Sequence, residues 1–278
     1  AGPDGYEPGE MAMLSDRAYG YMAELLNLVE AGGEWPQGMQ HGRVAHLEKE
    51  PRECDDALKF KPLVLLPALY RRWASARLET LRGWTSMWAL SSIYAGAEPQ
   101  GATEATYQIG TQIELAELLG RYIARGAIDI SKFFDQMPCQ LIYMLARQAG
   151  MPSTIVEAYR RYQEELQMRN TVAGGIGKPF AKMVGIPQGD PLSMLFAALL
   201  LRAWANMMEG EEVTPYLFVD DMMIIAEGKE QEEVERAFIR CMNKTHEYLR
   251  AMGAKTAAKK SSNFANCINV KTTLTEHK

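Results

Sequence analysis

The strongest constraint on the fold is an apolar run at residues 216–225, which is interrupted only by Asp220 and Asp221. Side chains alternate between the two faces of a strand and aspartate favours turns, so the run predicts a β-hairpin with both carboxylates at its tip. A plain turn would also account for the pair. Carboxylates that lie close together repel one another unless a cation neutralises them, and Mg²⁺ prefers such oxygen ligands. The hairpin tip is therefore a candidate metal site.

A second apolar stretch, residues 126–131, carries Asp129 near its end. Burying a lone carboxylate is costly unless it is paired or bound to a metal, so an aspartate in a short apolar strand needs an explanation. The ordinary explanation is a strand-end aspartate that caps the next turn. The alternative is that this strand lies beside the hairpin and brings a third carboxylate to the same point.

The loop at residues 185–193 reads GIPQGDPLS and holds two glycines and two prolines. These residues predict a tight, stiff loop, and Pro191 is favoured in the first turn of the helix that follows. Such a loop can lay its backbone against a flat ligand, and Gln188 can hydrogen-bond to a base or sugar edge. A loop that only caps a helix is the alternative.

The rest of the chain predicts a mixed fold, and its composition of 47% hydrophobic and 23% charged residues is that of a globular protein. Periodicity predicts strands at 43–49, 59–66, 126–131 and 215–226, and helices at 11–30, 67–82, 101–124, 138–149, 152–168, 190–208 and 229–252. This order favours an α+β sheet of the split βαβ kind.

Three segments carry a family resemblance: AIDISKFFDQMP at 127–138, GIPQGDPLS at 185–193 and FVDD at 218–221. In this order they resemble motifs A, B and C of reverse transcriptases, most closely those of non-LTR (LINE-type) retrotransposons and group II introns. KPLVLL and LYRRWA, between residues 61 and 74, resemble the fingers segment of that family. GAK and KKS, between residues 253 and 261, resemble the segment that supplies a lysine beside the triphosphate.

The resemblance implies the fingers and palm of a right-hand polymerase, with a palm built on a ferredoxin-like antiparallel sheet backed by helices. It assigns residues 1–42 to an N-terminal extension, 43–125 with 150–182 to the fingers, and 126–149 with 183–264 to the palm. Residues 265–278 would be a tail where a thumb begins, so we expect no thumb in this chain. The first residue is alanine, and we expect a processed chain or a fragment of a longer one.

The resemblance also implies the catalytic residues. Asp129 and Asp220 would hold two Mg²⁺ ions (or Mn²⁺), with help from the Ile130 carbonyl and from Asp221. Two such ions stabilise the attacking and leaving oxygens of an in-line displacement. Lys260 would lie near the pyrophosphate as a cation or proton donor.

Substrate-binding residues follow from the same comparison. The residues that would bind substrate are Lys49, Lys61, Arg71, Ile130, Phe134, Gln188 and Gly189. Lys49 and Lys61 would grip the triphosphate, and Gln188 with Gly189 would contact the nucleotide or the template base. A bulky Phe134 would exclude a ribose 2′-hydroxyl and select dNTPs, although core packing is the simpler reading of either phenylalanine at 133 and 134.

The sequence departs from the family pattern at several positions. Lys61 stands where the family usually has arginine, which loses a bidentate phosphate contact. Residues 96–103 lack the two arginines that are common there. Asp190 replaces a usual serine, and we expect it to place a negative charge beside the template path, where it would disfavour nucleic acid.

The formal net charge of −5 argues against a nucleic-acid partner, but its distribution does not. Basic residues dominate residues 57–82 and 239–261, which are the inferred fingers and the triphosphate side of the palm. The expected partners are an RNA template, a DNA or RNA primer and dNTPs, with no membrane. Four scattered cysteines favour a reducing, intracellular compartment, nuclear or cytoplasmic, with an organelle not excluded.

The sequence therefore predicts an RNA-directed DNA polymerase of a retrotransposon-like element. The alternative is an inactive or truncated remnant that binds only RNA or protein. RNA-directed RNA synthesis is disfavoured by Phe134. The clustered acids favour the enzyme, because a remnant has no physical need for them.

Overall fold

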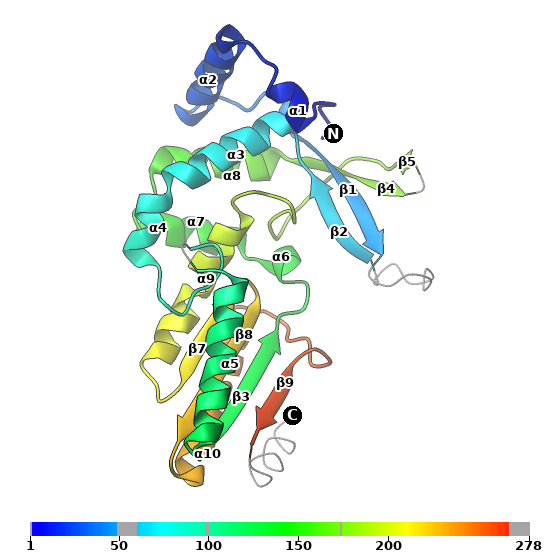
Figure 1. Ribbon diagram of the computed structural model, residues 1–278. Coiled ribbons are helices and arrows are strands. Elements are labelled where there is room, and N and C mark those ends of the chain that lie inside the picture. The colour runs from blue at the N-terminus through cyan, green and yellow to red at the C-terminus, as the bar shows by residue number, and fades with distance from the viewer. Residues whose placement is uncertain (1, 49–59, 98–99, 173, 267–278) are drawn as a thin grey trace. The chain divides into compact units, whose positions relative to one another are not determined.

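A computed structural model describes residues 2–48, 60–97, 100–172 and 174–266 (Figure 1). The chain divides into two compact units. The first unit holds Ala1–Trp84 and Phe134–Ser193, and the second holds Thr85–Phe133 and Met194–Lys278. Each unit has its own sheet and its own core.

The first unit combines several helices with a small mixed sheet. Its helices are α1 (Pro8–Met11), α2 (Asp16–Glu30), the 3₁₀ turn η1 (Gln37–Met39), α3 (Ala68–Thr80), α7 (Cys139–Gln148) and α8 (Ser153–Glu165). Its strands are β1 (His41–Glu48), β2 (Phe60–Leu65), β4 (Gln167–Val172), β5 (Gly175–Ile176) and β6 (Phe180–Ala181). The order is β2-β1-β4-β5 with β6 also on β4, and β1 runs parallel to β4. The short helices α4 (Arg82–Trp88) and α6 (Phe133–Gln136) cross the unit boundary.

The second unit is built on a four-stranded antiparallel sheet. Its elements are α5 (Ala102–Leu118), β3 (Tyr122–Asp129), α9 (Ser193–Glu209, which begins at the boundary), β7 (Thr214–Phe218), β8 (Asp221–Gly228), α10 (Gln231–Ala251) and β9 (Ser262–Ala265). The strand order is β7-β8-β3-β9. The chain order β3, helices, β7, β8, α10, β9 gives the ferredoxin-like arrangement. The predicted α+β class and palm-type sheet are therefore confirmed.

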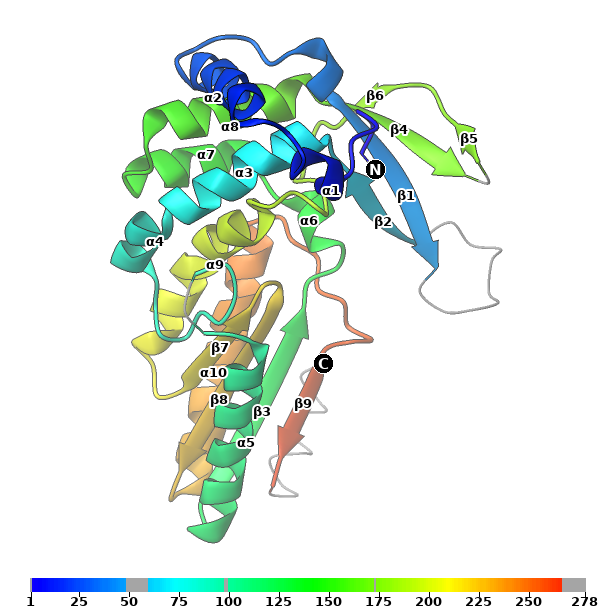
Figure 2. The same cartoon turned by 45° about the horizontal axis from the view of Figure 1, so that its top comes forward.

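Helices cover both faces of this sheet (Figure 2). Ile123, Tyr216 and Ile225 form a buried cluster with residues of α5 on one face. On the other face α10 lies so close that a Cβ on Gly126 would come within 2.7 Å of the Met242 Sδ atom. A glycine in the middle of β3 therefore lets the helix approach the strand.

Two sequence predictions about these elements need correction. The helix expected at 101–124 ends at Leu118, because Gly120 has a positive φ of 62° and Tyr122 already pairs with β8. The strand expected at 126–131 accordingly covers Tyr122–Asp129. Strands β4 and β9 were not predicted, because they pair with strands that are distant in sequence. Strands β5 and β6 were not predicted, because each has only two residues.

The unit boundaries do not coincide with the predicted fingers and palm. Residues 85–125 belong to the second unit, while 134–149 and 183–193 belong to the first. The names fingers and palm describe expected functions, and they remain predictions. Among the described residues, no helix combines the length and the hydropathy that a membrane span requires.

Candidate active site

Two of the predicted carboxylates face each other across neighbouring strands. Asp129 is the last residue of β3 and Asp221 is the first of β8, and the two are register partners in the antiparallel pair. Directly opposed residues place their side chains on the same face of a sheet, with Cβ atoms roughly 5 Å apart. The strand pairing itself therefore brings these two acids together.

Asp220 lies in the two-residue turn between β7 and β8, as the hairpin prediction requires. The residue before it, Val219, has a positive φ of 58°. A β-branched residue in this region of φ is strained, and such strain persists only where the surrounding structure enforces it. Among the described residues, Lys132 is the other non-glycine with positive φ, and it follows Asp129 by three positions.

Lys260 reaches the same point from the segment before β9. Its Nζ lies 2.6 Å from the Asp129 Oδ2 atom. The Ala257 N–H donates to the Asp129 carbonyl at 2.8 Å, and the Ser131 N–H donates to the Lys255 carbonyl at 2.7 Å. These two bonds flank Ile130, so the Ile130 carbonyl points away from this segment, towards the side of β3 where β8 lies.

The charges at this point influence one another. Burial raises the pKa of the Asp220 carboxyl, and the charges of Asp221 and Asp129 raise it further. Burial and the charge of Asp129 raise the pKa of Asp221. The hydrogen bond to Asp129 raises the pKa of Lys260. The amine thus acts as a counter-ion to acids that otherwise repel one another.

The donor set suits a hard divalent cation. Mg²⁺ is usually held by one or two carboxylates together with water and substrate phosphates, and Asp129 with Asp221 supplies such a pair. As the described side chains are arranged, no three His, Cys, Asp or Glu residues close around one metal position. Asp129 is paired with an amine instead, so a metal ion would have to take the place of the Lys260 charge.

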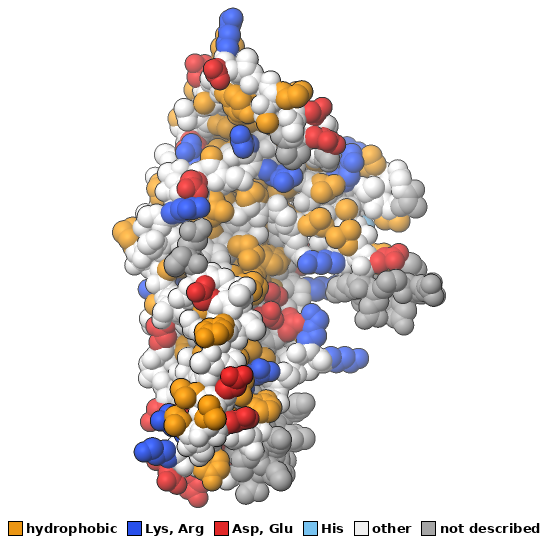
Figure 3. Space-filling model, in the orientation of Figure 1, with side chains coloured by type: hydrophobic (Ala, Val, Ile, Leu, Met, Phe, Trp, Pro, Cys, Tyr) orange, Lys and Arg blue, Asp and Glu red, His pale blue; other side chains and the backbone are white. Residues whose placement is uncertain are grey.

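An open cleft adjoins the carboxylates within the second unit. It has a volume of about 260 Å³, and its lining includes Asp129, Asp221 and Lys260 beside Thr106 and Phe218. Figure 3 shows acidic and basic side chains next to each other on this face. The acids share their face of the sheet with the α5 cluster, so the cleft is apolar on one side and charged on the other.

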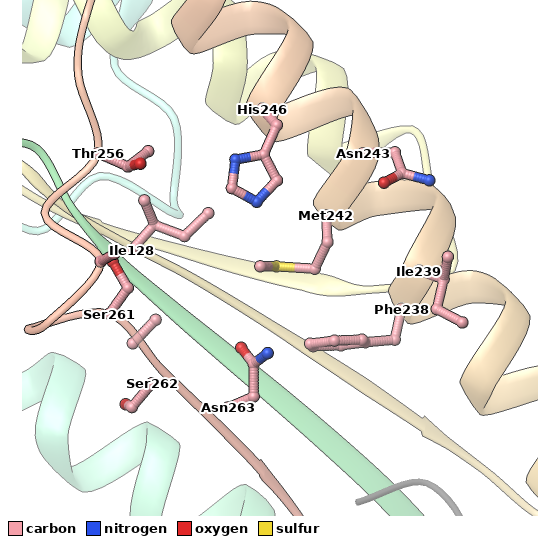
Figure 4. Close-up of a pocket in the computed structure, with 12 residues that line it drawn as sticks. Ile128, Phe238, Ile239, Met242, Asn243, His246, Thr256, Ser261, Ser262 and Asn263 are labelled. Carbon is pink, nitrogen blue, oxygen red and sulfur yellow. The ribbon is translucent and has the colours of Figure 1, made fainter. Parts of the chain in front are cut away.

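The other face of β3 lines a separate pocket of about 320 Å³ under α10. Figure 4 shows Met242 and His246 of α10 and Ile128 of β3 around this space, with Ser261 at its edge. Ile128 and Ser261 are the chain neighbours of Asp129 and Lys260. The pocket therefore lies behind the strand that carries the acid, and the predicted site residues do not line it.

The predicted nucleotide loop lies in the first unit and is held against β2. The Val64 N–H donates to the Gln188 carbonyl at 2.8 Å. Gly189 has a φ of 115°, and a Cβ there would lie 2.6 Å from the Val64 carbonyl oxygen. Glycine is therefore required at 189 both for its backbone angle and for the close approach. The Gln188 side chain is half-buried.

Other predicted substrate residues lie in the same unit. Lys61 on β2 and Arg71 on α3 are exposed, and Phe134 is half-buried whereas Phe133 is buried. The Ile186 N–H donates to the Phe134 carbonyl at 2.8 Å, which joins the predicted sugar-gate residue to the start of the loop. Lys49 lies outside the described residues.

Asp190 does not lie where we expected it. Its side chain is 3% exposed, so it places no charge beside a template path. The Tyr70 hydroxyl and the Gln163 amide donate to its Oδ2 atom at 2.8 and 2.7 Å, and the Leu192 N–H donates to Oδ1 at 2.9 Å. Sequence reasoning missed Tyr70 and Gln163, because no local spacing links either residue to Asp190.

The sequence of the chain matches that of a known protein family. A family model described as reverse transcriptase (RNA-dependent DNA polymerase) matches residues 55–273. The chain belongs to the reverse transcriptase family. The resemblance predicted from the three motifs is therefore confirmed.

The relatives of this reverse transcriptase chain are proteins of R2 elements. It is 25% identical over 244 residues to the Pol polyprotein of a type-1 R2 retrotransposable element from Nasonia vitripennis, covering 83% of this chain and 22% of that protein. It is 26% identical over 275 residues to the Pol polyprotein of the type-2 element R2DM from Drosophila melanogaster, covering 93% and 24%. The chain thus spans about a quarter of the length of these relatives.

Solved telomerase structures share the fold. A Candida tropicalis telomerase in complex with a fragment of telomeric RNA matches with a TM-score of 0.60 at 10% identity, over 90% of this chain and 45% of that one. A truncated apo form from the same organism matches with a TM-score of 0.58 at 11% identity, over 90% and 55%. At this identity the likeness concerns the fold alone.

Proposed function

We propose that this chain carries the polymerase active site of an R2-like retrotransposable element and copies RNA into DNA. The observation that best supports this proposal is the pairing of Asp129 with Asp221 at the end of the sheet, with Lys260 bound to Asp129. It occurs in a member of the reverse transcriptase family. In the reaction a primer 3′-oxygen bonds to the α-phosphorus of a dNTP. The bond to the β-phosphate breaks, and pyrophosphate leaves.

The residues of the second unit would manage charge during this step. Asp129 and Asp221, with Asp220 beside them and the Ile130 carbonyl, would hold Mg²⁺. When bound, two such ions would stabilise the attacking and leaving oxygens. Lys260 would neutralise phosphate charge once its amine is no longer paired with Asp129. The fit rests on Asp220 and Asp221, because burial and then the nearby charge of Asp129 raise the pKa values of both carboxyls.

The residues of the first unit would hold the nucleotide. Lys61 and Arg71 are exposed cations suited to phosphate, and Gln188 with the bare backbone of Gly189 would contact the base pair. Phe134 would stand against a ribose 2′-hydroxyl. An RNA template is supported by the retrotransposon relatives, and the primer and dNTPs follow from the proposed reaction.

Primer extension tests the proposal. The chain is incubated with an RNA template, an annealed DNA primer, Mg²⁺ and dNTPs, beside Asp220→Ala and Asp129→Asn variants. Glu117→Gln, an exposed substitution on α5, is the matched control. We expect template-dependent extension by the wild-type chain and by Glu117→Gln, and none by the two aspartate variants.

Two results would contradict the proposal. Equal extension by wild type and Asp220→Ala would show that the activity comes from elsewhere. Salt-sensitive RNA binding without any extension would favour the binding remnant instead.

A further inference from the structure

Asp190 is a buried acid that accepts several hydrogen bonds and has no place in the chemistry proposed above. Three donors from three different parts of the first unit converge on it: Tyr70 on α3, Gln163 on α8 and the Leu192 N–H beyond its own loop. Tyr70 and Leu192 are fully buried and Gln163 is 9% exposed. A carboxylate is the side chain that accepts from several donors without offering a hydrogen of its own.

One of these donors, Tyr70, is held in place by its aromatic neighbours. The Tyr70 ring stacks on Tyr162 with centroids 3.4 Å apart and planes 6° apart, and it meets Trp35 edge-on at 5.7 Å. A ring clamped in this way fixes the position of its hydroxyl. The hydroxyl in turn fixes the Asp190 side chain.

The loop before Asp190 is attached at two further points. At its start the Gly185 and Ile186 N–H groups donate to the Met137 and Phe134 carbonyls. Two residues before Asp190, the Gln188 carbonyl accepts from the Val64 N–H. Gln188 and Gly189, which the proposed function assigns to the nucleotide, therefore lie between the attachments at Ile186 and Asp190.

We propose that Asp190 is a positioning residue that ties the 185–191 loop to α3 and α8 and so sets the orientation of Gln188 towards the incoming nucleotide. This inference rests on the proposed function only for the role of Gln188. The attachment of the loop is a property of the first unit and can be measured without catalysis. Lys61 and Arg71 would grip phosphate, whereas Asp190 would act through the loop backbone.

Hydrogen exchange of the full chain tests the attachment. Asp190→Ala removes the acceptor for all three donors, Asp190→Asn keeps one acceptor oxygen for the Leu192 N–H, and Tyr70→Phe removes one donor. We expect the Val64 and Leu192 amides to exchange at least about tenfold faster in Asp190→Ala, with smaller changes in the other two variants. Ile142→Ala on α7, a buried residue outside the network, controls for a general loss of stability.

The outcomes of the exchange measurement separate the two explanations. Faster exchange confined to the loop and β2 supports the attachment. Uniformly faster exchange across the first unit, as expected for Ile142→Ala, or unchanged exchange at Val64, would overturn it. Neither result depends on polymerase activity, so failure of the proposed function would be recognised separately by the absence of extension.

A mutant cycle then tests the orientation of Gln188. For single-nucleotide extension, Asp190→Ala should raise KM for the dNTP about tenfold with a smaller change in kcat. In a Gln188→Ala background the same substitution should change KM less than about twofold, because the oriented group is already gone. Equal effects of Asp190→Ala in both backgrounds would refute a role through Gln188, and an effect on kcat alone would indicate only a loss of folded enzyme.

Discussion

Both units contain aspartates in predicted motifs, but the groups around these aspartates differ between the two units. In the second unit Asp129, Asp220 and Asp221 face other acids and a single amine, Lys260. In the first unit Asp190 is buried among donors. Acids that face one another favour binding of an outside cation, whereas an acid that accepts hydrogen bonds from several parts of the chain holds those parts together. The comparison teaches that the neighbouring groups of a carboxylate, more than its residue type or its place in a motif, determine its role.

Removing a carboxylate of the acidic cluster in the second unit should have the largest effect, and it should act on the reaction rate. Asp129→Asn should lower the rate of primer extension by on the order of 10³-fold, since it removes about 4 kcal/mol of charge stabilisation at the reacting phosphate. Single-turnover extension measures the rate, and unfolding measured alongside should show no loss of stability. If the loss of activity were explained by a loss of stability alone, Asp129 would not differ in role from Asp190.

Removing Asp190, the acid that is buried among donors, should mainly affect stability. Asp190→Ala leaves buried donors without an acceptor and should lower the free energy of unfolding by about 3 to 4 kcal/mol. Asp221→Ala, at an exposed position among like charges, should change it by less than about 0.5 kcal/mol. Urea denaturation followed by tryptophan fluorescence compares the two. Equal destabilisation by both variants would contradict the comparison.

The pH dependence of stability should sharpen the difference further. Burial raises the pKa of Asp190 to about 6, although its hydrogen bonds from Leu192, Tyr70, Tyr159 and Gln163 oppose the shift. An acid whose pKa is raised on folding contributes stability that is complete below its unfolded pKa, near 4, and is lost as the pH rises through about 6.

This pH effect is measured as a difference between wild type and Asp190→Asn, because the amide does not titrate. The advantage of wild type over the variant should shrink by up to about 3 kcal/mol between pH 4 and pH 6.5. Urea titrations at several pH values supply both curves. Parallel curves would mean that Asp190 has the same pKa in the folded and unfolded chain.

The neighbouring residues Phe133 and Phe134 also differ in their surroundings. Phe133 is buried and Phe134 is half-buried, so only the second has surface to offer a substrate. Phe134→Ala should raise the use of rNTPs relative to dNTPs by about tenfold, and Phe134→Tyr should preserve the selectivity. Competition between dNTP and rNTP in single-nucleotide extension measures this, and unchanged selectivity would remove Phe134 from the proposed sugar gate.

The smallest expected effect concerns the strained hairpin turn. Val219→Asn relieves a positive φ that asparagine tolerates and should raise the free energy of unfolding by about 1 kcal/mol. Thermal unfolding would show the gain. If the strain serves the placement of Asp220, extension should fall slightly at the same time; a rise in both would show that the strain is incidental.

The sequence was sufficient to predict the strands β3, β7 and β8 and the acids on them, because the signal is local. An apolar strand that ends in aspartate and an apolar hairpin interrupted by Asp220 and Asp221 carry their own periodicity. The same local rule overextended the helix at 101–124, where a single glycine ends it and the following residues pair with β8. It also missed β9, whose partner strand lies far back in the chain.

The environment of Asp190 could not be predicted in this way. Tyr70 precedes it by 120 residues and Gln163 by 27, so no spacing rule links them. The residue type alone suggested an exposed charge near a template. In the fold, Asp190 is instead buried and accepts hydrogen bonds from distant side chains. Long-range hydrogen bonds between side chains are the part of the site that a single sequence conceals.

The pairing of Asp129 with Asp221 has a consequence for how such a gene can vary. Side chains repeat every two residues along a strand, so shifting β8 by one position would turn Asp221 towards α10 and Ile224 towards α5. Folding and chemistry thus depend on one shared register. A single-residue insertion or deletion in the turn between β7 and β8 should consequently be tolerated far less often than a substitution there.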